Sequence, residues 1–358
     1  MKCEDEMKVL VVETKLWIVD KTVDNTQPYP QIIEAAHLLA KNEVVAFPTE
    51  TVYGLGANAR SEEAVKKVFE AKGRPNDNPL IVHIASQSQL EEIVVDIPPI
   101  AKQLMDAFWP GPLTLILKQK SGTLAAAVTA GLDTVAVRMP DHAVARQLIE
   151  SSGLPIAAPS ANTSGKPSPT LAKHVQDDLY GRIAGIVDGG PTGVGVESTV
   201  LDCTEDIPII LRPGGVTKEQ LETIIGQVKE DRAFVKKDEA PKAPGMKYTH
   251  YAPKAPLTLV KGERAFIQQL INEKRAEGMK VGLLAASEHQ ALYEADYIVA
   301  PGSLAELSTV ASGLYDALRQ FDDVHVDIIY SEVFPRAGIG QAIMNRLFKA
   351  AGQQIIKQ

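Results

Sequence analysis

Small polar side chains and prolines gather in one stretch near the middle of the chain, residues 155–169 (PIAAPSANTSGKPSP). The apolar run over residues 155–158 predicts a short buried strand, and Ser160, Asn162 and Ser164 follow its end. Prolines restrict the backbone of the loop, so Ser160, Asn162 and Ser168 can be held ready for a ligand. A Pro/Ser-rich surface turn is the alternative interpretation of this stretch.

Four cationic side chains are the other candidate ligand groups. Lys72 and Arg74 flank the glycine that ends a predicted helix, while Arg138 and Arg212 stand in apolar strand patterns. A guanidinium group suits phosphate and carboxylate because it can donate to two oxygens at once. Together with the polar strand ends, these cations predict an anion site. Taken singly, they are also explained by internal ion pairs, exposed strand edges or a helix C-terminus.

Common catalytic motifs are missing from the sequence. There is no GxxxxGK[ST], GxSxG or HExxH pattern, and no close pair of histidines. Gly338-Ile-Gly340 lacks the third glycine of a dinucleotide-binding fingerprint and lies near the end of the chain. His83, in PLIVHI, is compatible with either a buried core histidine or a ligand group. No protein nucleophile is evident, and any nucleotide must be held without a P-loop.

Length and composition indicate a globular protein of about two domains. The chain has 358 residues, of which 45% are hydrophobic and 23% charged, and no apolar run reaches membrane-spanning length. The acidic N-terminus does not resemble a secretory signal, so we expect a cytoplasmic location. Cys3 and Cys203 are expected to be free thiols. A net charge of −8 argues against a surface that binds nucleic acid throughout, but permits a local basic pocket.

Alternating helix and strand patterns run to about residue 226 and predict a first α/β domain. Ser61 is expected to cap the second of its helices, and Gly73 to end that helix in a left-handed conformation. The strands outnumber the helices that could connect them in parallel, which predicts a mixed, twisted sheet. The expected helices span residues 31–41, 61–71, 100–109 and 171–179, with another starting at Thr217, and the expected strands span 43–47, 79–84, 113–117, 134–139, 184–187, 198–202 and 208–212.

Residues 227–256 lose this periodicity and are rich in charge and proline, which predicts a linker. Its tyrosines and histidine are more than a solvated spacer needs, so the segment is expected to dock. Residues 257–358 then predict an open parallel sheet of the Rossmann or flavodoxin kind, because helical spans separate the strands. The strands are expected over residues 257–260, 281–285, 297–299 and 326–330, and the helices over 265–276, 289–295, 304–321 and 342–351.

Several motifs in a fixed order resemble those of one enzyme family. They are PTETVYGLG (48–56), KGRPNDNPLIVHI (72–84), WPGPLTLIL (109–117), GLDTVAVRMP (131–140), PIAAPSAN (155–162), GVESTV (195–200), LRPGG (211–215) and PGMKYTHYAP (244–253). The chain resembles the long, two-domain form of the threonylcarbamoyl-AMP synthase family over nearly its whole length. The resemblance implies a YrdC-like catalytic domain over residues 1–226, a linker that folds over the active site, and a Rossmann-like C-terminal domain.

The implied activity is a nucleotidyl transfer that joins L-threonine, bicarbonate and ATP into threonylcarbamoyl-AMP and pyrophosphate. The threonine amine would form a carbamate, whose oxygen would attack the α-phosphorus of ATP, so the nucleophile would belong to the substrate. Mg²⁺ would share in neutralising the phosphates. The product would pass to the machinery that makes N6-threonylcarbamoyladenosine in tRNA, and stable direct tRNA binding is not expected.

The resemblance also implies roles for single residues, but it does not identify the metal ligands. The expected catalytic residues are Lys72, Arg74, Ser160 and Asn162. The residues expected around threonine are Thr51, His83, Arg138 and Ser198. Those expected at the nucleotide are Arg74, Asn78, Thr134, Ser160, Ser168, Arg212, Tyr248 and His250.

Two other functions compete with this one. A module that binds double-stranded or ribosomal RNA could use the same basic concave face, but the acidic total charge counts against it. A hydrogenase-maturation carbamoyltransferase would share the YrdC-like domain, but would also need zinc-finger cysteines, and this chain has two cysteines in all.

Overall fold

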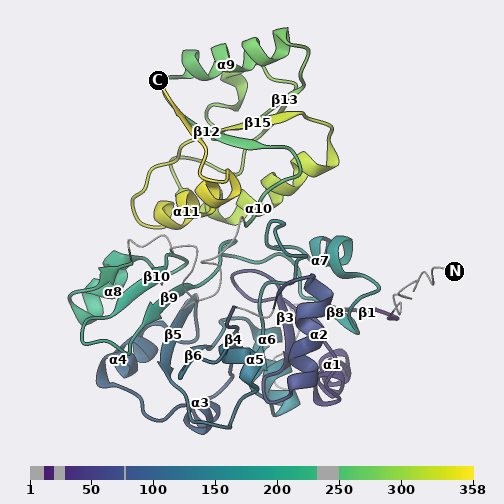
Figure 1. Cartoon of the computed structure of the whole chain (residues 1–358), viewed down its shortest axis with the longest axis vertical. Coiled ribbons are helices and arrows are strands. Elements are labelled where there is room, and N and C mark those ends of the chain that lie inside the picture. The colour runs from purple at the N-terminus through teal and green to yellow at the C-terminus, as the bar shows by residue number, and fades with distance from the viewer. Residues whose placement is uncertain (1–11, 20–28, 76–77, 232–249) are drawn as a thin grey trace, which may run out of the picture.

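The computed structural model describes residues 12–19, 29–75, 78–231 and 250–358, which form two α/β domains (Figure 1). The second domain rests on the first through helices α10 (Leu307–Asp323) and α11 (Gly340–Ala350), while α9 (Arg264–Ala276) covers the opposite face of its sheet. None of the helices described is both long and apolar enough to cross a membrane.

The first domain is built on a mixed sheet, as the sequence predicts. Its described strands lie in the order β1-β8-β2-β3-β7-β4-β6-β5-β9-β10-β11, with both parallel and antiparallel neighbours. The strands are β1 (Lys15–Ile18), β2 (Val45–Phe47), β3 (Gly54–Asn58), β4 (Ile81–His83), β5 (Leu113–Lys118), β6 (Thr134–Arg138), β7 (Ile156–Ala157), β8 (Gly185–Asp188), β9 (Thr199–Asp202), β10 (Ile209–Arg212) and β11 (Lys229–Glu230). Because β11 pairs with β10, this sheet continues past residue 226.

The helices of the first domain begin at side-chain caps where the sequence offers them. Ser61 accepts a hydrogen bond from the Ala64 amide at the start of α2, and Gly73 ends that helix with φ of 62°. Thr217 and Gln220 form a capping box at the start of α8. The helices are α1 (Pro30–Ala40), α2 (Glu62–Lys72), α3 (Gln87–Ile93), α4 (Pro99–Phe108), α5 (Ala126–Thr129), α6 (Ala143–Ser152), α7 (Ala172–Leu179) and α8 (Lys218–Ile225).

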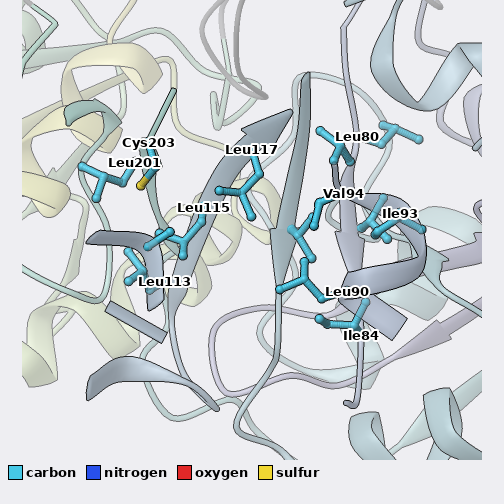
Figure 2. Packing of buried hydrophobic residues seen from close by; sticks show 14 of the residues in the cluster. Leu80, Ile84, Leu90, Ile93, Val94, Leu113, Leu115, Leu117, Leu201 and Cys203 are labelled. Carbon is cyan, nitrogen blue, oxygen red and sulfur yellow. The ribbon is translucent and has the colours of Figure 1, made fainter. Parts of the chain in front are cut away.

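The core of the first domain lies on the two faces of its sheet. Leu113, Leu115 and Leu117 point from β5 to one face, beside Leu201 and Cys203 (Figure 2). The last of these is the free thiol predicted from the sequence, and burial raises its pKa to about 12. Burial of apolar area at roughly 25 cal/mol per Å² is what stabilises such layers, so the sheet forms a rigid support for the loops at its strand ends.

Residues 250–358 are described without a gap and confirm the predicted parallel sheet. Its strands lie in the order β14-β13-β15-β12-β16, and every neighbouring pair is parallel. The strands are β12 (Leu257–Lys261), β13 (Val281–Leu284), β14 (Tyr297–Val299), β15 (Ile328–Glu332) and β16 (Ile355–Lys357).

One helix predicted in the second domain is wrong, that over residues 289–295. The structure has a single 3-10 turn there, Gln290–Leu292, which leaves Leu292 53% exposed. The segment has no apolar stripe to bury, and it instead turns the His289 and Tyr293 side chains onto Glu332. Helices α3, α5 and α6 and strands β1, β3, β11 and β16 are present but were not predicted.

The two domains share a hydrophobic cluster. Val52 and Val196 of the first domain pack with Leu314 and Phe334 of the second. At the same contact, Gly195 has φ of 79°, and a Cβ built there would lie 2.3 Å from the Cα of Ser312 in α10. The backbones of the two domains therefore touch without an intervening side chain.

We predict that Gly56→Ala destabilises the first domain. A Cβ at residue 56 would lie 2.7 Å from Cε1 of Phe47 and 2.9 Å from Cγ2 of Ile156, both fully buried. Overpacking of this kind costs about 1–3 kcal/mol of unfolding free energy, measurable by urea denaturation. Gly193→Ala is the control, because its nearest neighbour would be 3.9 Å away. Equal stability of the two variants would contradict the prediction.

Candidate active site

A cavity opens where several strands of the first sheet end. It encloses about 790 Å³ of space between its walls, including the part open to solvent. Strand pairing brings segments that are distant in sequence together here. His83 at the end of β4 pairs with Arg138 at the end of parallel strand β6, and Gly54 forms an isolated antiparallel β-bridge with Ser160, which follows β7. The lining residues include Thr49, Thr51, Lys72, Arg74, His83, Arg138, Ser160, Asn162, Ser164, Lys166, Glu197, Ser198, Arg212, His250 and Tyr251.

Lys72 organises the loop that follows β7. It is the last residue of α2, and its ammonium group donates to the carbonyl oxygens of Ser160 at 2.5 Å and Asn162 at 2.6 Å. The Ser160 hydroxyl donates to Oδ1 of Asn162 at 2.5 Å, and the Asn162 amide donates to the carbonyls of Thr163 and Lys166. The loop is thus held in one conformation, with its polar groups at the cavity wall.

The charge on Lys72 is costly where it lies. Burial, followed by the positive charge of Arg74, lowers the pKa of Lys72 to about 7, although Asp178 opposes the shift. At neutral pH the charged and uncharged forms of this side chain are therefore both populated. A polyanion bound in the cavity would favour the charged form.

Arg138 is buried in the cavity wall and already has an acidic partner. Its Nη2 lies 2.6 Å from Oε1 of Glu50, Nη1 donates to the Thr51 hydroxyl at 2.9 Å, and Nε donates to the Gly111 carbonyl at 3.2 Å. The strand position predicted from the sequence is confirmed. Sequence analysis offered two explanations for Arg138, an anion site and an internal ion pair. The structure shows the ion pair, with Glu50, and also places Arg138 in the cavity wall.

His83 is neutral in this site. Burial, and then the charge of Arg138, lowers its pKa to about 3. Its ring packs edge-on against Phe47, with centroids 6.2 Å apart. A neutral imidazole can donate one hydrogen bond and accept another, which suits an uncharged hydroxyl or amine better than a second anion.

Arg212 and Ser198 form a second polar wall. Nε and Nη2 of Arg212 donate to the Ser198 carbonyl at 3.1 and 2.9 Å, and Nη2 also donates to the Ser198 hydroxyl at 3.1 Å. That hydroxyl pairs with the hydroxyl of Thr114 at 2.7 Å. Burial lowers the pKa of Arg212, as does the charge of nearby Arg346. The guanidinium is thereby fixed at the end of β10.

Most of the residues singled out in the sequence meet at this cavity. Lys72, Arg74, Ser160, Asn162, Thr51, His83, Arg138, Ser198, Arg212 and His250 all line it. Ser168 is buried behind the wall, where it donates to Glu197 at 2.6 Å. Tyr248 lies outside the described residues.

Asn78 and Thr134 are not among the lining residues. Thr134 begins β6 and Arg138 ends it, so the two are about 13 Å apart along the strand. Asn78 is fully buried, and its side-chain amide has no hydrogen-bond partner among the described residues. An unpaired buried amide costs about 1–3 kcal/mol, which a ligand that bonds to it would recover.

Sequence analysis missed Glu197 as a site residue. It is 7% exposed and accepts hydrogen bonds from Ser168, from Tyr315 of α10 and from Arg346 of α11. Burial opposes its ionisation, but Arg346 and then Arg212 bring the pKa of Glu197 down to about 2. The available signal was an acidic residue within the apolar run GVESTV. Thr49 and Lys166 also line the cavity without having been predicted to do so, and Tyr251 is one of the linker tyrosines that were expected to dock.

The described residues contain no group of three or more histidine, cysteine, aspartate or glutamate side chains placed to hold a metal ion. The polar wall is instead rich in cations and hydroxyls. Such a surface binds anions of modest size and can support reactions in which negative charge moves between oxygen atoms.

Family comparisons cover both domains. A family model named for Sua5, YciO and YrdC, described as "Telomere recombination", matches residues 37–214. A second, described as "Threonylcarbamoyl-AMP synthase, C-terminal domain", matches residues 216–352.

Individual relatives match over almost the full chain. The threonylcarbamoyl-AMP synthase of Bacillus subtilis is 61% identical over 346 residues, which cover 97% of this chain and all of that protein. That of Pyrococcus abyssi is 52% identical over 328 residues, covering 90% of this chain and 94% of that protein. The crystal structure of P. abyssi Sua5 complexed with L-threonine has a TM-score of 0.90 at 49% identity, and covers 96% of this chain and 100% of that one.

The pKa of Lys72 predicts a pH dependence of stability. In the unfolded chain a lysine titrates near 10.4, so above pH 7 the folded state has released a proton that the unfolded state still binds. The free energy of unfolding should therefore rise between about pH 7 and 10, by up to about 1.4 kcal/mol per unit from this group. Lys72→Met should lack this increment.

Urea denaturation of both proteins at pH 7, 8 and 9 measures the difference. The substitution also removes two hydrogen bonds, which lowers the unfolding free energy by the same amount at every pH. The test is therefore whether the difference in unfolding free energy between the two proteins changes with pH. Parallel pH profiles for Lys72→Met and the unaltered protein would show that the buried ammonium keeps its proton.

Proposed function

The chain belongs to the Sua5/YciO/YrdC family, and from this membership we propose that it synthesises threonylcarbamoyl-AMP. It is an enzyme that uses L-threonine, and we assign it to the nucleotidyltransferases, with ATP and bicarbonate as the other substrates. One observation carries the proposal: the cavity brings together five lysine and arginine side chains, the neutral His83 and several hydroxyls in a chain that matches a threonine-bound structure along almost its whole length.

The proposed chemistry needs little from the protein except placement. The threonine amine loses a proton and adds to CO₂ from bicarbonate, forming an N–C bond and a carbamate. A carbamate oxygen then attacks the α-phosphorus of ATP, the bond to the β-phosphate bridging oxygen breaks, and pyrophosphate leaves. Holding three anionic reactants together supplies much of the acceleration, since orientation alone can be worth about 7–11 kcal/mol.

We propose that Thr51, His83, Arg138 and Ser198 surround threonine. Arg138 would meet the carboxylate, and the Glu50 ion pair holds its guanidinium in place beforehand. His83 is neutral and would exchange hydrogen bonds with the threonine hydroxyl or amine without adding charge. Thr51 already receives a hydrogen bond from Arg138 at 2.9 Å, so the group is organised before a ligand arrives.

The nucleotide would lie along the other walls. Arg74, Ser160, Arg212 and Lys72 line the cavity, and we assign Lys72 to the phosphates. The arrival of phosphates would raise the pKa of Lys72 and restore its charge. The buried Asn78 amide, Thr134, Ser168, Tyr248 and His250 complete the nucleotide set that the family resemblance implies. We retain Lys72, Arg74, Ser160 and Asn162 as the proposed catalytic residues.

ATP would enter as its Mg²⁺ complex. Mg²⁺ often keeps several waters and binds mainly to substrate phosphates, with one or two carboxylates from the protein. The basic wall of the cavity suits a metal that arrives on the nucleotide. The ion would lessen the negative charge that the carbamate oxygen approaches.

The proposed role places the protein at the start of a tRNA modification. Its product would be handed to the machinery that transfers the threonylcarbamoyl group to adenosine, and we propose a cytoplasmic location for both steps. The comparisons support this synthase function and give no support to the RNA-binding module considered from the sequence.

Pyrophosphate release tests the proposed function. With Mg²⁺ and ATP present, we expect release to require both threonine and bicarbonate, and labelled bicarbonate to appear in an adenylate product. Omission of either substrate should reduce the signal to background. Equal release without threonine would indicate an ATP hydrolase, and tight, steeply salt-dependent RNA binding without turnover would favour the RNA-binding alternative.

Arg138→Ala tests the assignment of the threonine carboxylate. Loss of an anion clamp should remove about 2–4 kcal/mol of binding free energy, which lowers the threonine affinity by about 30-fold to 1,000-fold, measured by calorimetry. Arg60→Ala is the control, because Arg60 forms an exposed ion pair with Glu92 away from the cavity lining. Circular dichroism must show that both variants fold. An unchanged threonine affinity in folded Arg138→Ala would reduce Arg138 to a structural role.

A further inference from the structure

Side chains of the second domain reach the wall of the cavity. The hydroxyl of Tyr315 lies 2.9 Å from Oε1 and 2.8 Å from Oε2 of Glu197, and Nε of Arg346 donates to Oε2 at 2.8 Å. Both side chains are fully buried. The other described hydrogen-bond donor to this carboxylate is Ser168, from the first domain. Glu197 itself faces the cavity beside Ser198 and Arg212.

The same pair also supports Tyr251, a buried residue of the cavity wall. The rings of Tyr251 and Tyr315 lie 5.2 Å apart, and the guanidinium carbon of Arg346 lies 5.9 Å from the centroid of Tyr251. Tyr251 has φ of 67°, a left-handed conformation that costs about 1–3 kcal/mol in a residue other than glycine. The next amide, that of Ala252, donates to the Gly165 carbonyl. Contacts from both domains hold this conformation in place.

We propose that Tyr315 and Arg346 are positioning residues of the active site, which act from the second domain through Glu197 and Tyr251. The inference rests on the function proposed above and adds to it the part played by the C-terminal domain. Sequence analysis placed the linker over the active site and gave the C-terminal domain no residue in it. In the structure this domain donates hydrogen bonds directly to Glu197, which lines the cavity.

The physical reason is competition between carboxylates and phosphates for arginine. Glu197 is ionised and buried, so it must keep donors on both oxygens. Without the Tyr315 hydroxyl, Ser168 would still donate to Oε1 and Arg346 to Oε2, but the carboxylate would have lost one donor and would interact more strongly with Arg212, whose charge already acts on it. An ion pair there would compete with the anionic substrate for that guanidinium. Tyr315 and Arg346 therefore keep the charge of Glu197 directed away from the ligand.

Other contacts join the domains without touching Glu197. Arg319 of α10 is bound to Asp178 at 2.9 Å, and Asp316 of the same helix lies 3.0 Å from Nε2 of His174. These contacts join the two domains independently of Glu197. Asp316 follows Tyr315 directly in the chain, and neither it nor His174 lines the cavity. Asp316→Asn is thus a matched control for an effect of docking alone.

The test is a double-mutant cycle between Tyr315→Phe and Glu197→Gln, with Asp316→Asn beside it. The readout is the affinity for a non-hydrolysable ATP analogue by calorimetry, which inactive variants also give, together with kcat and KM for pyrophosphate release. We expect Tyr315→Phe to weaken nucleotide binding about tenfold or more in the natural background. With Glu197→Gln, which removes the competing charge, the same change should cost less than about threefold. Asp316→Asn should stay within about twofold of the unaltered protein.

Two results would overturn the inference. Unaltered nucleotide affinity in Tyr315→Phe would show that the hydroxyl positions nothing, and an equal loss in both backgrounds would show that it acts by docking instead of through Glu197. Should Tyr315→Phe fail to fold, Arg346→Lys enters the same cycle, because lysine keeps the charge but loses the donor geometry. Absence of threonine-dependent pyrophosphate release in the unaltered protein would refute the proposed synthase function, while the binding cycle would still report on the inference.

Discussion

Burial of charge at the ends of strands is the constraint around which this molecule is built. Each buried ion in the cavity wall needs partners, because an uncompensated charge there would cost several kcal/mol. Carbonyl oxygens compensate Lys72, Glu50 and a carbonyl compensate Arg138, and the Ser198 carbonyl holds Arg212. These pairings fix each group in one geometry, which is the condition for placing reactants accurately.

A mixed sheet makes this arrangement available. In a strictly parallel sheet, the strand ends at one edge all share a direction, and the chain returns through helices. Here β4 and β6 run parallel and place His83 beside Arg138, while antiparallel β3 brings the Gly54 bridge to Ser160. The groups therefore come from segments that are far apart in sequence, and no local motif contains more than a few of them.

Local sequence patterns predicted both sheets and most of the polar residues that line the cavity. Hydrophobic periodicity predicted the mixed and the parallel sheets, and the cap at Ser61 followed from the residue type. Strand β3, with two glycines in GLGAN, has little strand propensity and forms because its neighbours pack against it. Glu197 was missed because its donors Tyr315 and Arg346 stand 118 and 149 residues further along the chain. Partners supplied by tertiary structure leave no mark in a local window of sequence.

The backbone contact at Gly195 bears on how freely the two halves of this protein can be exchanged during evolution. Its φ of 79° and the 2.3 Å from its would-be Cβ to Ser312 Cα leave no room for a side chain. A gene fusion that paired this C-terminal half with a foreign N-terminal half would have to inherit glycine at that point. The steric requirement at this one residue therefore restricts which N-terminal domains can be combined with this C-terminal domain, even though the two domains are encoded by separate stretches of the gene.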